Sequence, residues 1–204
     1  MRSDYDAEMV ANFREQVRQQ IVPMALTLKR KQANRLGLPA LKYYDEPLSF
    51  KSGNATPKGT PEWIIENGKK MYTELSDETA TFFNFMLDNE LMDLVAKKGK
   101  AGGGYCTYIS GFKSPFIFSN FNGTSADIDV LTHEVGHAFQ VYMSRGFETA
   151  EYYWPTSDGA EIHSMSMEYF AYPWMDNFFN GDADKYRYSH LVDSLLFLPY
   201  GVAV

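Results

Sequence analysis

The sequence predicts a mainly α-helical protein that also contains a small β-sheet. Long stretches are rich in the strong helix formers Ala, Glu, Gln, Arg, Lys, Leu and Met. Residues 102–121 differ from them, because they form short aromatic and β-branched runs separated by Gly, Lys and Ser. With 204 residues, of which 45% are hydrophobic, the chain can bury one sizeable core or two small ones.

The first helical stretch runs from Asp4 to about Leu36 and contains Pro23. Proline lacks the backbone N–H that continues a helix, so we expect a kink or a break there. Residues 37–60 are rich in Pro, Gly, Ser and Asn and predict a connector.

Helical pattern resumes at Pro61, which suits the first turn of a helix. A further helix is expected from Ser76 to about Lys98, with Ser76 as its N-cap. Residues 102–108 and 115–121 then predict two strands of a small sheet.

The last part of the chain predicts three more helices. The first spans residues 124–145 and ends at Gly146, a common residue after a helix. An aromatic loop follows, and the other two helices are expected at about 158–179 and 182–197.

Composition excludes several classes of partner. A formal net charge of −7 disfavours non-specific binding to nucleic acid and to anionic membranes. No apolar run approaches the ~20 residues that a membrane helix needs. The single cysteine, Cys106, cannot form an internal disulfide, and acidic residues stand where a signal peptide would be basic. We therefore expect a cytoplasmic protein without nucleic-acid or membrane partners.

The helix expected at 124–145 contains the motif HExxH, as His133-Glu-Val-Gly-His137. Residues four apart on a helix differ by about 40° in azimuth and ~6 Å along the axis, so both imidazoles can reach one zinc ion. Glu134 lies ~100° from His133, where it borders the metal without binding it. This position suits a general base that takes a proton from metal-activated water.

Zinc in a catalytic site requires a third protein ligand. Residues 161 and 168 are both Glu, seven apart, and therefore share one face of the helix expected at 158–179. That helix is otherwise apolar, and a buried carboxylate is costly unless it binds something. The residues alone leave both glutamates open. Further acidic candidates precede them, at Glu148, Glu151 and Asp158.

The HExxH motif, followed by Glu161-Ile-His-Ser-Met-Ser-Met-Glu168, resembles the M3 family of zinc oligopeptidases, most closely its oligoendopeptidase F branch. Residues 102–108 and 115–124 resemble the strands and turn before the metal helix in that branch. The resemblance implies a zincin-type catalytic domain, with Glu161 as the third Zn²⁺ ligand and Glu134 as base and acid. It also implies that Glu168 is the hydrogen-bond partner of a ligating histidine.

The resemblance further implies a zinc-dependent endopeptidase that hydrolyses short peptides. Family members are longer, and after the two zinc-site helices they carry a His and Tyr residues that stabilise the tetrahedral intermediate. His190 and Tyr200 do not match that pattern. We therefore expect residues 1–204 to form a single, incomplete catalytic domain.

Two other functions stay open from the sequence. The chain can be a non-catalytic metal-binding fragment of a split or truncated peptidase, which works only with a complementing C-terminal segment. It can also be a structural helical domain whose HExxH motif is incidental, although two of its four histidines stand in that motif.

Overall fold

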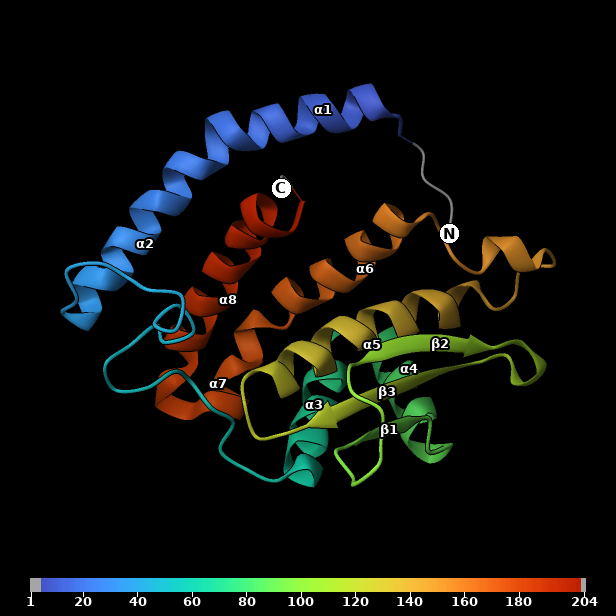
Figure 1. The fold of residues 1–204 in the computed structure, drawn as a ribbon. Helices are drawn as coiled ribbons and strands as arrows, with labels where there is room; N and C mark the ends of the chain where they lie inside the picture. Colours follow the sequence, from blue (N-terminus) through green and yellow to red (C-terminus); the bar gives the residue numbers. More distant parts are fainter. Residues whose placement is uncertain (1–4, 203–204) are drawn as a thin grey trace. The chain divides into compact units, whose positions relative to one another are not determined.

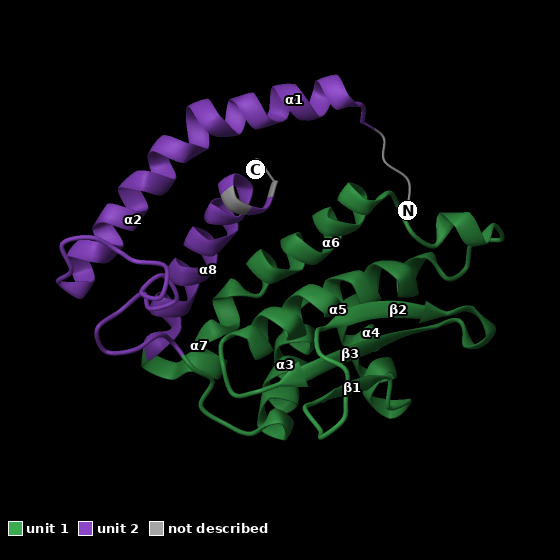
Figure 2. Cartoon of the chain, in the orientation of Figure 1, with its two compact units in different colours: residues 1–3, 56–181 green, residues 4–55, 182–204 purple. Residues whose placement is uncertain are grey.

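The structure, a computed structural model, describes residues 5–202 and divides them into two compact units (Figures 1 and 2). Unit 1 comprises residues 56–181, and unit 2 comprises residues 5–55 and 182–202. Helices dominate both units, and unit 1 contains a three-stranded sheet. The prediction of a mainly α-helical chain with a small sheet is therefore confirmed.

Unit 2 contains α1 (Ala7–Gln16), α2 (Val22–Leu36) and α8 (Ala183–Phe197). The interruption expected near Pro23 is present as a wider π-helical turn, Val17–Ile21, between α1 and α2. Proline cannot donate the next helical hydrogen bond, so the ladder widens just before it.

The sheet of unit 1 consists of β1 (Met92–Val95), β2 (Tyr105–Ile109) and β3 (Ser114–Phe121) in the order β1-β3-β2. Strand β3 pairs in parallel with β1 and antiparallel with β2. The two predicted strands correspond to β2 and β3, and β1 was not predicted.

The prediction of a helix from Ser76 to Lys98 is confirmed for its first half and wrong for the rest. Helix α4 (Asp77–Asp88) ends at Asn89, and Glu90 adopts a positive φ of 53° that reverses the chain. The following residues extend into β1, which pairs with Ile117 and Phe118 of β3. The pairing of β1 with β3 therefore outweighs the local helical preference of the residues that form β1.

The helix predicted at 158–179 is interrupted. Helix α6 (Ser157–Phe170) is followed by a 3₁₀ turn, Tyr172–Trp174, and by the short α7 (Met175–Phe179). Pro173 lies in that turn and cannot donate an α-helical hydrogen bond, so the α-helix ends before it.

The core of unit 1 lies among α3 (Pro61–Leu75), α4, α5 (Ala126–Ser144) and the sheet. Tyr72, Phe82 and Phe83 are fully buried there, and the Tyr72 hydroxyl donates to the Leu131 carbonyl at 3.2 Å. Helix α5 packs on β2 and β3 and contacts α6 extensively (Figure 1).

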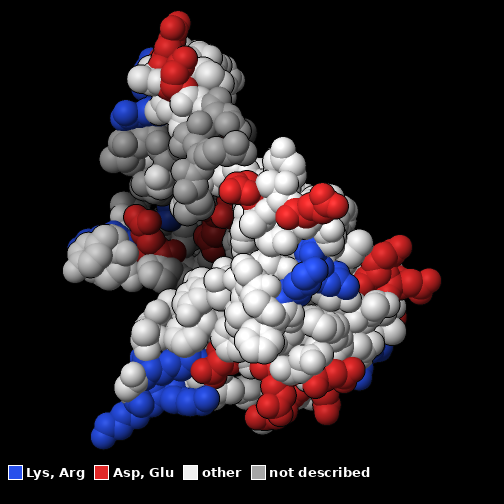
Figure 3. Space-filling view, turned by 90° about the vertical axis from the view of Figure 1, so that its right-hand side faces the viewer, with Lys and Arg blue, Asp and Glu red and all other residues white. Residues whose placement is uncertain are grey.

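Most charged side chains lie on the surface, whereas Asp127 and Glu168 are buried. On the face drawn in Figure 3, acidic side chains form several separate groups and basic side chains gather in a few patches. Among the described residues, no helix is long and apolar enough to cross a membrane.

Gly136 sets the distance between α5 and α6. A Cβ atom added to Gly136 would lie 2.6 Å from the Ser164 Cα and 3.0 Å from the His163 carbonyl oxygen. Ser164 is fully buried at this contact. The two backbones can therefore be this close only because residue 136 has no side chain.

Replacing Gly136 with Ala tests this contact. Helix propensity alone would make Ala stabilising by about 0.5–1 kcal/mol, whereas overpacking costs about 1–3 kcal/mol. We expect Gly136→Ala to lower the free energy of unfolding, measured by chemical denaturation. The control is Gly146→Ala, since a Cβ there meets nothing within 4 Å. A Gly136→Ala variant as stable as the control would contradict the close contact.

Candidate metal centre

Helix α5 presents His133 and His137 on one face, one turn apart. Their ring centroids are 4.9 Å apart and the rings are nearly perpendicular, at 84°. The start of α5 is fixed by Asp127, which is buried and accepts hydrogen bonds from the backbone N–H groups of Asn122 (2.9 Å) and Gly123 (2.8 Å). The turn after β3 thereby sets where the two imidazoles lie over the sheet.

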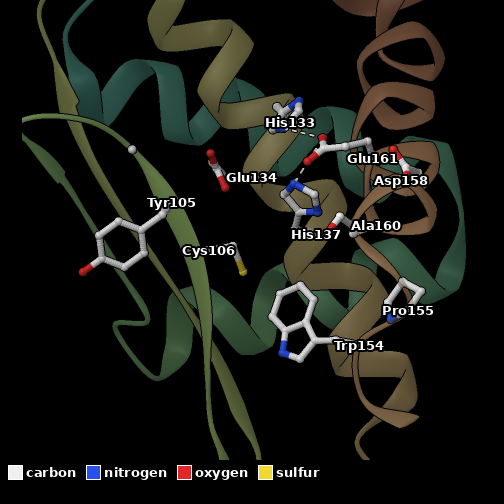
Figure 4. Close-up of a pocket in the computed structure, with 12 residues that line it drawn as sticks. Tyr105, Cys106, His133, Glu134, His137, Trp154, Pro155, Asp158, Ala160 and Glu161 are labelled. Carbon is white, nitrogen blue, oxygen red and sulfur yellow. Dashed lines mark ion pairs between the residues drawn. The ribbon is translucent and has the colours of Figure 1, made fainter. Parts of the chain in front are cut away.

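Helix α6 places the Glu161 carboxylate opposite both imidazoles (Figure 4). Its Oε2 atom is 3.3 Å from His133 Nε2 and 3.6 Å from His137 Nε2. One potential ligand atom from each of the three residues lies within 4.8 Å of the others. Two ligands that bind a tetrahedral zinc ion at about 2.0–2.1 Å are themselves roughly 3.3–3.4 Å apart. The observed spacing therefore fits a single ion.

Hydrogen bonds hold the ligand atoms in this orientation. Ser164 Oγ donates to Glu161 Oε2 at 2.8 Å. Glu168 is 8% exposed, and its Oε1 atom is 2.5 Å from His133 Nδ1. A carboxylate at Nδ1 favours the tautomer that carries its proton there, which leaves the Nε2 lone pair free to bind a metal. Glu168 thus has the geometry predicted for it, and its role stays a prediction.

The two histidines differ in the direction of their pKa shifts. Burial lowers the pKa of His137, and the neighbouring His133 lowers it further. Burial also acts to lower the pKa of His133, but the hydrogen bond and charge of Glu168 outweigh it and raise that pKa. His137 therefore favours the neutral form, which is the form that binds a metal.

Glu134 lies beside the cluster and lines the same cavity, on the side of β2 (Figure 4). Burial raises the pKa of its carboxyl group, and the charge of Glu161 adds to this effect. His133 and a hydrogen bond from the backbone of Cys106 act in the opposite direction. The arrangement brings together two imidazoles, one potential carboxylate ligand and a separate acid–base group.

These residues open on a cavity of about 500 Å³ between β2, α5 and the start of α6. Cys106, a residue of β2, is half-buried and lines the cavity. Trp154 also lines the cavity, and it was assigned only to an aromatic loop. Neither position carries a local sequence signal, because each faces the site through tertiary packing.

The remaining acidic candidates fall outside the cluster. Glu148 and Glu151 are exposed in the segment after α5, and Asp158 lines the cavity without joining the three converging residues. Within the described part of the chain, the converging group consists of His133, His137 and Glu161.

A helix that carries HExxH over a small sheet, with a carboxylate from the next helix, is the arrangement of a peptidase. The model of peptidase family M3 matches residues 2–190. The chain belongs to that family. No curated protein matches the chain.

Solved structures agree with this assignment. A Bacillus anthracis str. Ames protein assigned as an oligoendopeptidase F is 67% identical, with a TM-score of 0.96 over 98% of this chain and 37% of that chain. PZ peptidase A, solved with an inhibitor, is 66% identical, also with a TM-score of 0.96, over 98% of this chain and 36% of its own. A Chlamydophila abortus protein at 18% identity, with a TM-score of 0.70 over 96% of this chain and 32% of its own, shares the fold. The chain thus spans about a third of these relatives' length.

Replacing Glu168 with Gln tests its contact with His133. Loss of the carboxylate charge at Nδ1 is expected to weaken zinc binding about 10–100-fold, since the partner fixes and polarises the imidazole. Competition against a chromogenic chelator measures the affinity. The exposed Glu151→Gln variant serves as control and is expected to match the parent chain. Unchanged affinity in Glu168→Gln would contradict the role given to this contact.

Proposed function

We propose that this chain carries the zinc site of an endopeptidase that hydrolyses short peptides, with His133, His137 and Glu161 as ligands. The observation that supports it best is the spacing of 3.3 Å and 3.6 Å between Glu161 Oε2 and the two Nε2 atoms, with Glu134 lining the same cavity outside the converging group. Membership of peptidase family M3 and the similarity to an oligoendopeptidase F support the reaction and the substrate class.

The donor set suits zinc. Two imidazole nitrogens and one carboxylate oxygen are the protein ligands of many hydrolytic zinc sites, which keep a fourth position open. The cavity next to the cluster provides room for that position. When bound, zinc supplies a Lewis acid that lowers the pKa of water and polarises the peptide carbonyl.

The protein's own groups account for the proton transfers. Glu134 accepts a proton from the attacking water and delivers it to the amine that leaves when the peptide bond breaks. Glu168 holds His133 in the tautomer that directs Nε2 toward the cluster. Ser164 holds Glu161 by its hydrogen bond.

A second candidate function is that of a non-catalytic metal-binding fragment, which requires a complementing C-terminal segment for turnover. The chain covers 37% of its Bacillus anthracis relative, and this partial coverage favours the alternative. Assays of the chain alone, and with the C-terminal remainder of that relative supplied as a separate polypeptide, distinguish the two. Hydrolysis only in the complemented sample favours the fragment.

Removing one imidazole tests the metal centre. The parent chain is expected to bind about one zinc ion, and His137→Ala to lose it, because the two ligands that remain are too few to hold the ion. Elemental analysis of the purified proteins measures the stoichiometry. The control is His163→Ala, an exposed residue of α6 outside the cluster. Full zinc content in His137→Ala would exclude this site.

Replacing Glu134 with Gln separates metal binding from chemistry. The variant is expected to retain zinc and to lose hydrolysis by at least 10²–10⁴-fold, roughly the contribution of a general acid–base group. A fluorogenic peptide measures the rate in the sample that shows activity, and the exposed Glu148→Gln is the matched control. Activity that survives in Glu134→Gln would rule out Glu134 as the base.

A further inference from the structure

The cavity beside the candidate metal centre has an apolar part that the proposed proton transfers do not use. The histidines and Glu161 lie in one part of the cavity (Figure 4). The apolar part is lined by Trp154, Pro155, Ala160 and Cys106.

Trp154 contributes the largest side chain of this apolar part. It stands in the segment between the 3₁₀ turn Ala150–Tyr152 and α6, and its ring centroid lies 6.4 Å from that of His137, with an interplanar angle of 60°. Figure 4 shows the indole next to His137, with Cys106 on the β2 side and Pro155 on the α6 side. A group bound at the metal would therefore have its neighbouring atoms close to the indole.

The indole is half-buried, unlike the ring of Phe82, which is fully buried in the core. A tryptophan whose role was only to fill the core would be fully buried, as Phe82 is. Trp154 instead leaves part of its apolar surface in the cavity, and covering that surface with another apolar group is favourable.

On the β2 side of this apolar part, the Cys106 side chain itself carries no charge. Burial, together with the charge of Glu134, raises the pKa of the Cys106 thiol far above neutral pH. A thiol that stays protonated behaves as a small apolar side chain. Both walls therefore suit an aliphatic group, while Asp158 at the same cavity disfavours an acidic one.

We propose that Trp154, Pro155 and Cys106 form a binding subsite for the aliphatic side chain of the substrate residue that flanks the bond to be cleaved. The subsite rests on the proposed function, because the metal fixes where the cleaved bond lies. A leucine-sized side chain occupies part of the cavity of about 500 Å³ and leaves room for the peptide backbone. The side chain packs on the indole and excludes water from it.

Two zinc-binding probes that differ in one side chain test the subsite. After the zinc content is measured, leucine hydroxamate and glycine hydroxamate are titrated into the zinc-loaded chain by calorimetry. Both probes anchor on the metal, and the leucine side chain is expected to tighten binding about tenfold or more. In Trp154→Ala this preference is expected to fall below about threefold. Trp154→Phe is expected to restore most of it.

The control variant is Tyr152→Ala, which removes a neighbouring aromatic ring that is 66% exposed and does not line the cavity. This variant is expected to keep the full preference. Zinc content and glycine hydroxamate affinity equal to those of the parent chain show that Trp154→Ala retains its fold.

The outcomes separate the two proposals. A parent chain without zinc overturns the metal centre of the proposed function. A zinc-loaded chain with equal affinity for both probes, or a leucine preference that persists in Trp154→Ala, overturns the subsite and leaves the metal centre standing.

Discussion

The close approach of α5 and α6 at Gly136 is the constraint on which the candidate centre depends. Ser164 takes part in this contact twice: its Cα lies only 2.6 Å from where a Cβ of residue 136 would stand, and its hydroxyl donates to Glu161. Glu161 is one turn before Ser164, so the distance between the helices also decides how far its carboxylate lies from the imidazoles. Packing and ligand geometry are therefore determined at one place.

The same packing concentrates negative charge. Glu134, Glu161 and Glu168 share the site with two histidines, and Glu168 is buried. Buried carboxylates are costly unless they are paired. The buried Glu168 pairs with His133, whereas the half-exposed Glu161 is shared by two imidazoles that are neutral when they bind a metal. A divalent cation at their meeting point would compensate the charge that protein groups leave unpaired.

The sequence predicted the parts of this site that depend on local periodicity. The spacing of His133 and His137 requires only a helix, but the choice between Glu161 and Glu168 depends on the crossing of two helices. In the structure both glutamates face the same imidazole, one at Nε2 and the other at Nδ1, and no helical periodicity distinguishes these atoms. Strand β1 was not predicted for a related reason: it forms by pairing with β3, which lies more than twenty residues later in the sequence. Local patterns thus indicate elements, and long-range contacts decide which of them meet.

Metal binding and turnover have different structural requirements in this chain. The three potential ligands, Glu134 and the cavity all belong to unit 1, so the metal site needs only contacts within that unit. Peptide hydrolysis also needs hydrogen-bond donors positioned for the oxyanion of the tetrahedral intermediate. The chain covers 37% of an oligoendopeptidase F that it resembles at 67% identity. Because the ligands come from two packed helices, zinc binding is expected to persist even where those donors belong to another segment.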